Sequence, residues 1–298
     1  MVIQSLLLGY IALTQTPEAF DQARAWNWLT KQCDLGPRTP GSPAHIQCRD
    51  MILEESRKHC ARAEIQPFRH QWSKTNKDVE MWNVLAFHNW EKAKVRVVLA
   101  AHWDTRPSAD QENDSKKAAK PIMGANDGAS GVAVLLELMR LNKSLPEDIG
   151  VCYAFFDGED LGPELSEMFL GATYYSGHLK PPKPDYGILL DMIGDKDLKV
   201  PVEPNSYQKA QKVTVALYRH AKKVGLEKTF PMEYGPEIFD DHLSMNAAGI
   251  PTVDLIDFDY EHWHTLDDTV DKCSAESLGK VGKLLDTWLR VTPVWKPK

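Results

Sequence analysis

From residue 94 to the carboxyl end, short apolar runs rich in β-branched residues alternate with longer segments that have helical spacing. The apolar runs cover 94–101, 150–156, 186–190 and 251–256, and the helical segments cover 132–141, 168–178, 207–224 and 275–291. A near-continuous apolar run is typical of a strand that is buried on both faces. Strands that alternate with helices usually form a parallel sheet with helices packed on its faces. The sequence therefore predicts an α/β fold with a mixed, mostly parallel sheet.

The amino-terminal third of the chain is organised differently. Helical spacing is found at 18–31 and 45–60, and two segments of alternating polarity follow at 63–72 and 79–89. We expect these two segments to pair as antiparallel strands. Residues 104–123 form a long polar loop directly after a predicted strand, and loops of that length are usually functional or disordered. We interpret residues 1–298 as a single domain, and no internal repeat or low-complexity segment is present.

The composition argues against two classes of partner. With 298 residues, 43 % of them hydrophobic, the chain can bury a large core. It contains no stretch of about 20 apolar residues, so no membrane-spanning helix is expected. The formal net charge is −7 and no basic block stands out, which argues against nucleic acid as the main partner.

The sequence leaves the cellular compartment open. An apolar run at 3–13 has the length of a signal peptide, but no Lys or Arg precedes it and no clear cleavage site follows. Residues 1–17 are therefore a candidate signal or leader segment, and the protein is either exported or cytoplasmic. The five cysteines are odd in number and lack C-x-x-C spacing, so a disulfide among Cys33, Cys48 and Cys60 is expected only in an exported protein.

Residue types that bind metal occur in five short segments, four of which follow or lie in apolar runs. The segments are 101–104 (AHWD), 124–131 (GANDGASG), 155–160 (FFDGED), 189–194 (LLDMIG) and 263–265 (WHT). In open α/β sheets the carboxyl ends of the strands face the ligand crevice, so we expect these residues to meet at one place. Together, the five segments indicate a metal centre.

Three of these residues form a candidate ligand set. Asp127 alone would more often be a helix N-cap, and His264 alone would more often be a structural histidine. Glu159 and Asp160 are adjacent carboxylates that repel each other unless a cation or a shared proton relieves them. A catalytic zinc site needs about three protein ligands and an open position, which Asp127, Asp160 and His264 can supply. Glu159 is then free to carry a proton beside the metal.

The motifs GANDGASG, FFDGED, LLDMIG and WHTLDD, with their spacing, resemble those of the zinc aminopeptidase clan and its relatives, the animal-type glutaminyl cyclases. The resemblance extends from LGPRTPGSPAH, which begins at Leu35, to the carboxyl terminus. It implies a three-layer α/β/α sandwich around a twisted, mixed sheet. HWDTRPSAD and FFDGEDLG are most similar to the bacterial branch of the cyclases, and Asp160 stands where the animal enzymes carry Glu.

Similarity to the cyclases implies a reaction and a role for each site residue. An amino-terminal Gln of a peptide or protein, and more slowly Glu, would close to pyroglutamate, with release of ammonia from Gln. One zinc per chain would be held by Asp127, Asp160 and His264. Catalysis would use Glu159, supported by a network of acids that includes Asp191 and Asp240. The substrate pocket would contain Trp263, Trp103 and Phe239, with core packing an equal interpretation for Phe239. His102 would contact a ligand without binding metal itself.

Two other functions fit parts of the same pattern. Peptidases of the clan usually bind two metals, and His102 and Asp191 are candidates for ligands of a second ion, so a co-catalytic di-zinc aminopeptidase is the alternative. An inactive binding protein on the same scaffold is a third interpretation, and the complete set of candidate ligands with Glu159 counts against it.

Overall fold

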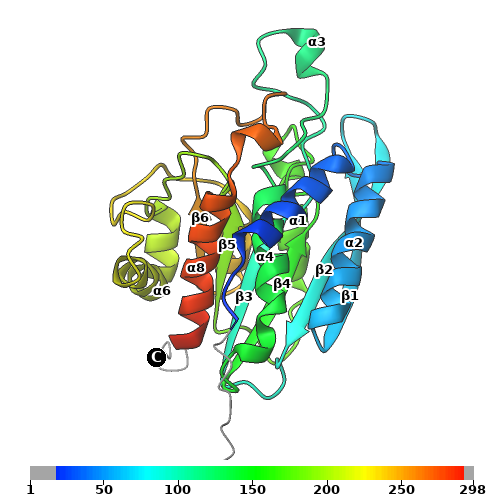
Figure 1. Ribbon diagram of the computed structural model, residues 1–298. Coiled ribbons are helices and arrows are strands. Elements are labelled where there is room, and N and C mark those ends of the chain that lie inside the picture. Colours follow the sequence, from blue (N-terminus) through cyan, green and yellow to red (C-terminus); the bar gives the residue numbers. More distant parts are fainter. Residues whose placement is uncertain (1–17, 292–298) are drawn as a thin grey trace, which may run out of the picture.

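The computed structural model describes residues 18–291, and its centre is a six-stranded sheet with the order β1-β2-β4-β3-β5-β6 (Figure 1). The strands are β1 (Arg62–Trp72), β2 (Lys77–His88), β3 (Val95–His102), β4 (Ile149–Phe156), β5 (Tyr186–Asp191) and β6 (Thr252–Ile256). β2 pairs antiparallel with both β1 and β4, whereas the β3–β4, β3–β5 and β5–β6 pairs are parallel. The predicted mixed, mostly parallel sheet and the predicted β1–β2 pair are confirmed.

Helices cover both faces of the sheet and complete the three layers. The core on one face includes α1 (Gln22–Asp34), α2 (Pro43–His59), α4 (Ala129–Arg140), α6 (Pro204–Lys223) and α8 (Ala275–Val291). The opposite face is covered by α5 (Leu170–Gly177) and α7 (Asp241–Ala247). Short helical turns η1 (Asn142–Ser144), η2 (Leu165–Glu167) and η3 (Val270–Lys272) lie in connections. In Figure 1, α1, α4 and α8 lie together in front of the strands.

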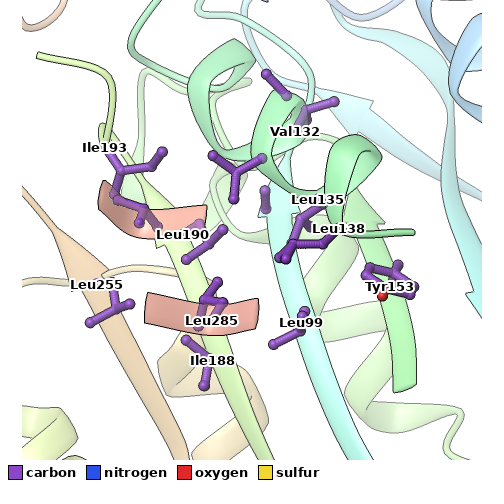
Figure 2. Packing of buried hydrophobic residues seen from close by; sticks show 14 of the residues in the cluster. Leu99, Val132, Leu135, Leu138, Tyr153, Ile188, Leu190, Ile193, Leu255 and Leu285 are labelled. Atoms are coloured by element: carbon purple, nitrogen blue, oxygen red, sulfur yellow. The ribbon is translucent and has the colours of Figure 1, made fainter. Parts of the chain in front are cut away.

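The larger core lies between the sheet and α4 and α8 (Figure 2). Leu99, Ile188 and Leu190 of the strands are buried together with Leu135 of α4 and Leu285 of α8. Each fully buried Leu or Ile side chain contributes roughly 1.5–3 kcal/mol relative to exposure. β4 is buried at every position, as its continuous apolar sequence requires. The core fixes the strands rigidly, and their carboxyl ends can therefore hold side chains in defined positions.

The loop after β3 and the start of α4 have features that the periodicity did not predict. Within residues 104–123, the part around a short helix, α3 (Ser115–Ala118), projects from the body of the fold, whereas residues 104–106 are buried (Figure 1). α4 begins at Ala129, directly after Gly128, whose φ is +94°. A Cβ at Gly128 would lie 2.9 Å from the backbone oxygen of Asp104, so only glycine fits this close approach.

α7 is a further helix that the sequence pattern did not predict. It has only seven residues and its first turn carries the polar Asp241 and His242, so it shows no amphipathic repeat. The apolar run at 3–13 lies outside the described residues. All five cysteines lie within the described part of the chain, where they are buried and unpaired. Among residues 18–291, no helix combines the length and the apolar character needed to cross a membrane.

Candidate active site

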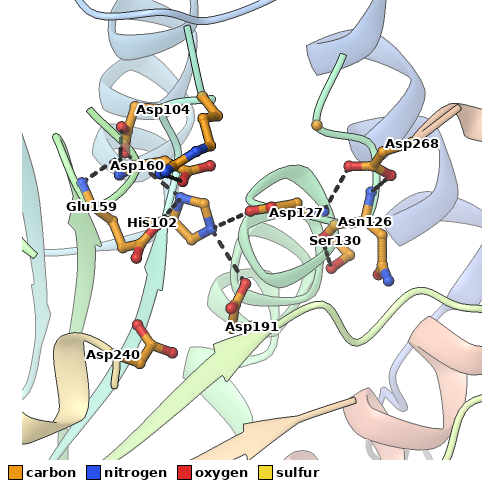
Figure 3. A network of polar contacts seen from close by, with 12 residues as sticks. His102, Asp104, Asn126, Asp127, Ser130, Glu159, Asp160, Asp191, Asp240 and Asp268 are labelled. Atoms are coloured by element: carbon orange, nitrogen blue, oxygen red, sulfur yellow. Dashed lines mark hydrogen bonds and ion pairs between the residues drawn. The ribbon is translucent and has the colours of Figure 1, made fainter. Parts of the chain in front are cut away.

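The five segments singled out in the sequence meet at the carboxyl ends of the parallel strands, and Figure 3 shows residues of the first four. His102 is the last residue of β3 and Asp191 the last of β5. Glu159 and Asp160 lie just after β4, and Asp127 lies just before α4. Because β3 lies between β4 and β5 in the sheet, three of these segments are neighbours before any loop is considered. His264 comes from the loop after β6.

Asp127, Asp160 and His264 form a buried group that fits a cation. One potential ligand atom from each residue lies within 4.8 Å of the others. Nε2 of His264 is 3.3 Å from Oδ1 of Asp160 and 3.6 Å from Oδ2 of Asp127. Oδ2 of Asp127 and Oδ2 of Asp160 are buried without a hydrogen-bond partner. Two buried carboxylate groups, each with one unpartnered oxygen, beside an imidazole nitrogen supply the oxygen and nitrogen donors that zinc takes, so the residues fit the metal.

The charges of this group favour uptake of a positive ion. Burial and the neighbouring charge of Asp160 raise the pKa of Asp127 to about 7. Although burial favours the neutral ring of His264, the charge of Asp160 and hydrogen bonds to Asp110 and Asp160 raise its pKa to about 9. Without a cation, the group therefore retains protons that free carboxylates and imidazoles would lose near neutral pH. A metal ion would replace these protons.

Glu159 lies beside this group and has the properties of a proton carrier. Burial, followed by the charge of Asp160, raises the pKa of Glu159 well above its usual value. Its position is fixed through the backbone, because the N–H groups of Glu159 and Asp160 donate to the two carboxylate oxygens of Asp104 at 3.2 and 3.1 Å. Asp104 ends the AHWD segment, but nothing in the sequence indicated this role.

His102 lies among the acids of the site. Its Nε2 is 3.1 Å from Oδ1 of Asp127 and 3.2 Å from Oδ1 of Asp191, and its Nδ1 is 3.7 Å from Oε2 of Glu159 (Figure 3). His102, Asp127 and Glu159 also form a second group whose ligand atoms lie within 4.8 Å of one another. The geometry therefore accommodates His102 either as a hydrogen-bond partner of Asp127 or as a ligand of a second ion.

The loop that carries Asp127 is fixed by an acid far away in the sequence. Oδ1 and Oδ2 of Asp268 accept the backbone N–H groups of Asn126 and Asp127 at 2.9 and 3.2 Å (Figure 3). The hydroxyl of Tyr260 donates to the same carboxylate at 2.8 Å. Asp268 closes the WHTLDD motif, but nothing in the sequence indicated what it would contact.

Asp240 belongs to a further buried group of acids. It is the N-cap residue of α7 and forms a compact group with His242 and Asp254, residues that the sequence analysis did not assign. Burial, followed by the charge of Asp254, raises the pKa of Asp240 well above its usual value. The charges of Asp191 and Glu159 act in the same direction. Asp240 and Asp191 thus lie within electrostatic reach of the expected acid–base residue.

Residues of the candidate zinc group and of the acid network line one small cavity of about 40 Å³. Its lining includes the following residues: Asp127, Glu159, Asp191, Phe239, Asp240, Trp263 and His264. The rings of Trp263 and His264 stack with centroids 4.0 Å apart. Phe239 lines the cavity and is 60 % exposed, so it lies at the rim and is not a core residue.

Trp103 does not lie where the sequence analysis expected it. It is fully buried, belongs to the main core and stacks on His45 with ring centroids 4.4 Å apart. It is absent from the lining of the small cavity. Successive side chains at the end of an extended strand point to opposite faces, so with His102 directed into the site, Trp103 is directed away from it. The assignment of Trp103 to the substrate pocket is therefore corrected.

Comparison with known proteins identifies a family model, solved structures and a curated relative that are similar to this chain. The sequence matches peptidase family M28 over residues 83–289. The crystal structure of a glutaminyl cyclase from Bacteroides thetaiotaomicron is 33 % identical, with a TM-score of 0.87, and the match covers 93 % of this chain and 99 % of that one. A leucine aminopeptidase precursor from Bacteroides thetaiotaomicron VPI-5482 matches with the same identity, TM-score and coverage. Glutaminyl-peptide cyclotransferase from Bos taurus is 27 % identical over 96 % of this chain and 86 % of its own length.

Proposed function

The chain belongs to peptidase family M28, and we propose that it is a glutaminyl-peptide cyclotransferase. Its substrates are peptides or proteins that begin with glutamine, and its products are ammonia and the pyroglutamyl chain. The α-amine attacks the side-chain γ-carbonyl of the same residue, so no water is consumed. Similarity to a solved glutaminyl cyclase over nearly the whole chain supports this assignment.

The observation that carries the proposal is the position of Glu159. Its buried carboxyl group lines the same small cavity as Asp127, His264 and Trp263. Ring closure needs one group that first takes a proton from the amine and then returns a proton to the leaving amide nitrogen. A carboxyl group whose pKa is raised toward the working pH suits both steps. Glu159 is therefore assigned as the general base and then the general acid.

Zinc, held by Asp127, Asp160 and His264, would supply a Lewis acid for the γ-carbonyl oxygen. The remaining steps belong to the chain's own residues. The charge of Asp191 raises the pKa of Glu159, and the charges of Asp191 and Glu159 raise the pKa of Asp240, so that a proton is retained within the acid network. Trp263 presents a flat apolar wall beside His264, which would orient the compact side chain and exclude water.

The number of zinc ions per chain is part of the proposal. We assign one zinc to the group of Asp127, Asp160 and His264, with His102 as a hydrogen-bond partner of Asp127. The second compact group, formed by His102, Asp127 and Glu159, favours the alternative of a di-zinc aminopeptidase, in which each group would hold one ion and Asp127 would belong to both. In that alternative Glu159 could not serve as a free proton carrier if it bound metal itself.

Two substrates tested on one preparation separate these functions. A fluorogenic peptide with amino-terminal Gln reports ring closure, and a Leu-anilide reports aminopeptidase activity. We expect the zinc-loaded wild type to act on the Gln peptide and to leave the Leu-anilide intact. Cleavage of the Leu-anilide without any pyroglutamate would reject the cyclase and favour the peptidase.

A further inference from the structure

The polar loop after β3 reaches back into the candidate metal site through two charged side chains. Arg106 is buried, and its Nη1 lies 3.0 Å from Oδ1 of Asp160 while its Nε lies 2.6 Å from Oδ2 of Asp110. Oδ1 of Asp110 lies 3.0 Å from Nδ1 of His264. Since Nε2 of His264 is 3.3 Å from Oδ1 of Asp160, the four side chains form a closed ring. Two members of the ring are candidate ligands, and the other two come from the loop.

We propose that Arg106 and Asp110 form a ligand clamp, a pair of positioning residues that orients Asp160 and His264 for metal binding. The proposal rests on the assignment of Asp160 and His264 as metal ligands in the proposed function. Arg106 determines which oxygen of Asp160 is available to bind the metal ion. Asp110 determines which nitrogen of His264 is available to bind it.

The contact to Asp110 fixes the tautomer of His264. A carboxylate accepts a hydrogen bond and cannot donate one, so Nδ1 of His264 must carry the proton. The lone pair of the neutral ring is then on Nε2, the nitrogen that faces Asp127 and Asp160. A carboxylate behind a ligating histidine also makes the ring a stronger donor to the metal.

The contact to Arg106 distinguishes the two oxygens of Asp160. Oδ1 accepts from the guanidinium and lies 3.3 Å from Nε2 of His264, whereas Oδ2 is buried without a hydrogen-bond partner. The free oxygen is thus available to a cation, and the planar, permanently charged guanidinium holds the carboxylate in place. Gly162 makes room for this group, because a Cβ there would lie 2.9 Å from Nη1 of Arg106.

Backbone contacts join the same part of the loop to the segment that carries His264. The N–H of Gln111 donates to the backbone oxygen of His264 at 3.3 Å. Oε1 of Glu112 accepts the N–H of Leu266 at 3.2 Å. Three consecutive residues, 110–112, therefore contact His264 or Leu266, and the clamp is held by more than one flexible side chain.

Zinc affinity of the apo-protein tests the clamp independently of turnover. The protein is stripped with a chelator, and zinc is returned in competition with a chromogenic chelator. The test variants are Asp110→Ala, Asp110→Asn, Arg106→Gln and Arg106→Lys. Asp114→Ala is the matched control, because Asp114 lies in the same loop but only caps the short helix α3. Circular dichroism of each apo-protein identifies variants that have not folded.

We expect Asp110→Ala and Arg106→Gln to weaken zinc binding by about 10- to 100-fold, the usual cost of losing an outer partner of a metal ligand. The visible absorption spectrum of the Co²⁺-substituted protein should change in both variants, and Arg106→Lys should recover part of the affinity. Asp114→Ala should bind zinc as the wild type does. If Asp110→Ala does not fold, Asp110→Asn decides the question, because it keeps the shape and removes the charge.

Wild-type zinc affinity together with an unchanged Co²⁺ spectrum in the folded Asp110 and Arg106 variants would overturn the clamp. This outcome differs from failure of the proposed function. If the wild type binds zinc but forms no pyroglutamate, and the variants still lose affinity, the clamp stands and the cyclase assignment falls.

Discussion

Nε2 of His102 lies 3.1 Å from Oδ1 of Asp127, the carboxylate shared by the candidate zinc group with Asp160 and His264 and by the group with His102 and Glu159. A contact of this length is a hydrogen bond when His102 carries the proton. If His102 instead bound an ion, Asp127 would bridge two metals. Whether His102 donates a hydrogen bond to Asp127 or binds an ion therefore distinguishes a cyclase site with one zinc from a peptidase site with two.

Replacing His102 by Ala tests that contact. Because we assign His102 as a hydrogen-bond partner of Asp127, His102→Ala should still bind one zinc per chain, as the wild type does. Metal analysis after gel filtration measures both stoichiometries. A wild type with two zinc ions, of which His102→Ala loses one, would contradict the single-zinc assignment.

Glu159→Gln is expected to keep the fold and the zinc but to lower turnover by at least about 100-fold, the usual scale for general acid–base catalysis. The amide has nearly the same shape as the carboxyl group but cannot exchange the proton. Steady-state kinetics and metal analysis on the same sample measure the two properties. Loss of zinc in this variant would instead make Glu159 a ligand and Asp160 the candidate base.

Trp263→Ala should impair catalysis while zinc stays bound. The Trp263 ring stacks on His264, and its centroid lies 4.9 Å from that of the Phe258 ring. Its loss therefore removes a wall of the cavity and not a metal ligand. We expect kcat/KM to fall by about 100-fold through lost positioning, and Trp263→Phe to retain more activity because it keeps a flat ring. Equal kcat/KM in the wild type and in Trp263→Ala would show that the ring does not touch the substrate.

Asp257 gives a prediction of pH dependence away from the metal ligands. Burial raises the pKa of this carboxyl group from 3.8 to about 6. The folded state therefore binds the proton more tightly than the unfolded state, and the contribution of Asp257 to stability falls as pH rises from about 4 to 6. Asp257→Asn should be more stable than the wild type above this window and lose that advantage below it.

Chemical denaturation of Asp257→Asn and the wild type across this pH range measures the difference. Asn can still accept the backbone N–H of Lys199, which donates to Oδ2 of Asp257 at 2.9 Å. The contributions of other titrating groups to the pH dependence of stability cancel, because the two chains are otherwise identical. A stability difference that does not vary with pH would contradict the assignment.

The sheet and the candidate ligands could be predicted because their signals are local. The apolar runs of β3, β4 and β5 are continuous, and the polar residues at or just after their ends include His102, Glu159 and Asp191. Parallel neighbours bring such ends together without further information. The short helix α7 gave no such signal, because seven residues with a polar first turn are too few for a periodic pattern.

The residues that support the ligands could not be predicted, because they are defined by contacts between distant parts of the chain. Asp268 accepts the backbone N–H of Asp127, which lies 141 residues away in the sequence. Asp110 contacts His264, which lies 154 residues away. Both are ordinary loop acids in the sequence. Trp103 was misassigned for a different reason, since its nearness to His102 in sequence does not determine the side of the strand on which the ring lies.

Product analysis in water enriched with heavy oxygen tests the central claim most directly. A peptide with amino-terminal Gln is incubated with the zinc-loaded protein, and the masses of the products are measured by mass spectrometry. Ring closure uses the substrate's own amine as nucleophile, so we expect a peptide that is lighter by one ammonia and carries no heavy oxygen. Release of free glutamine that contains heavy oxygen, with a peptide shortened by one residue, would contradict it.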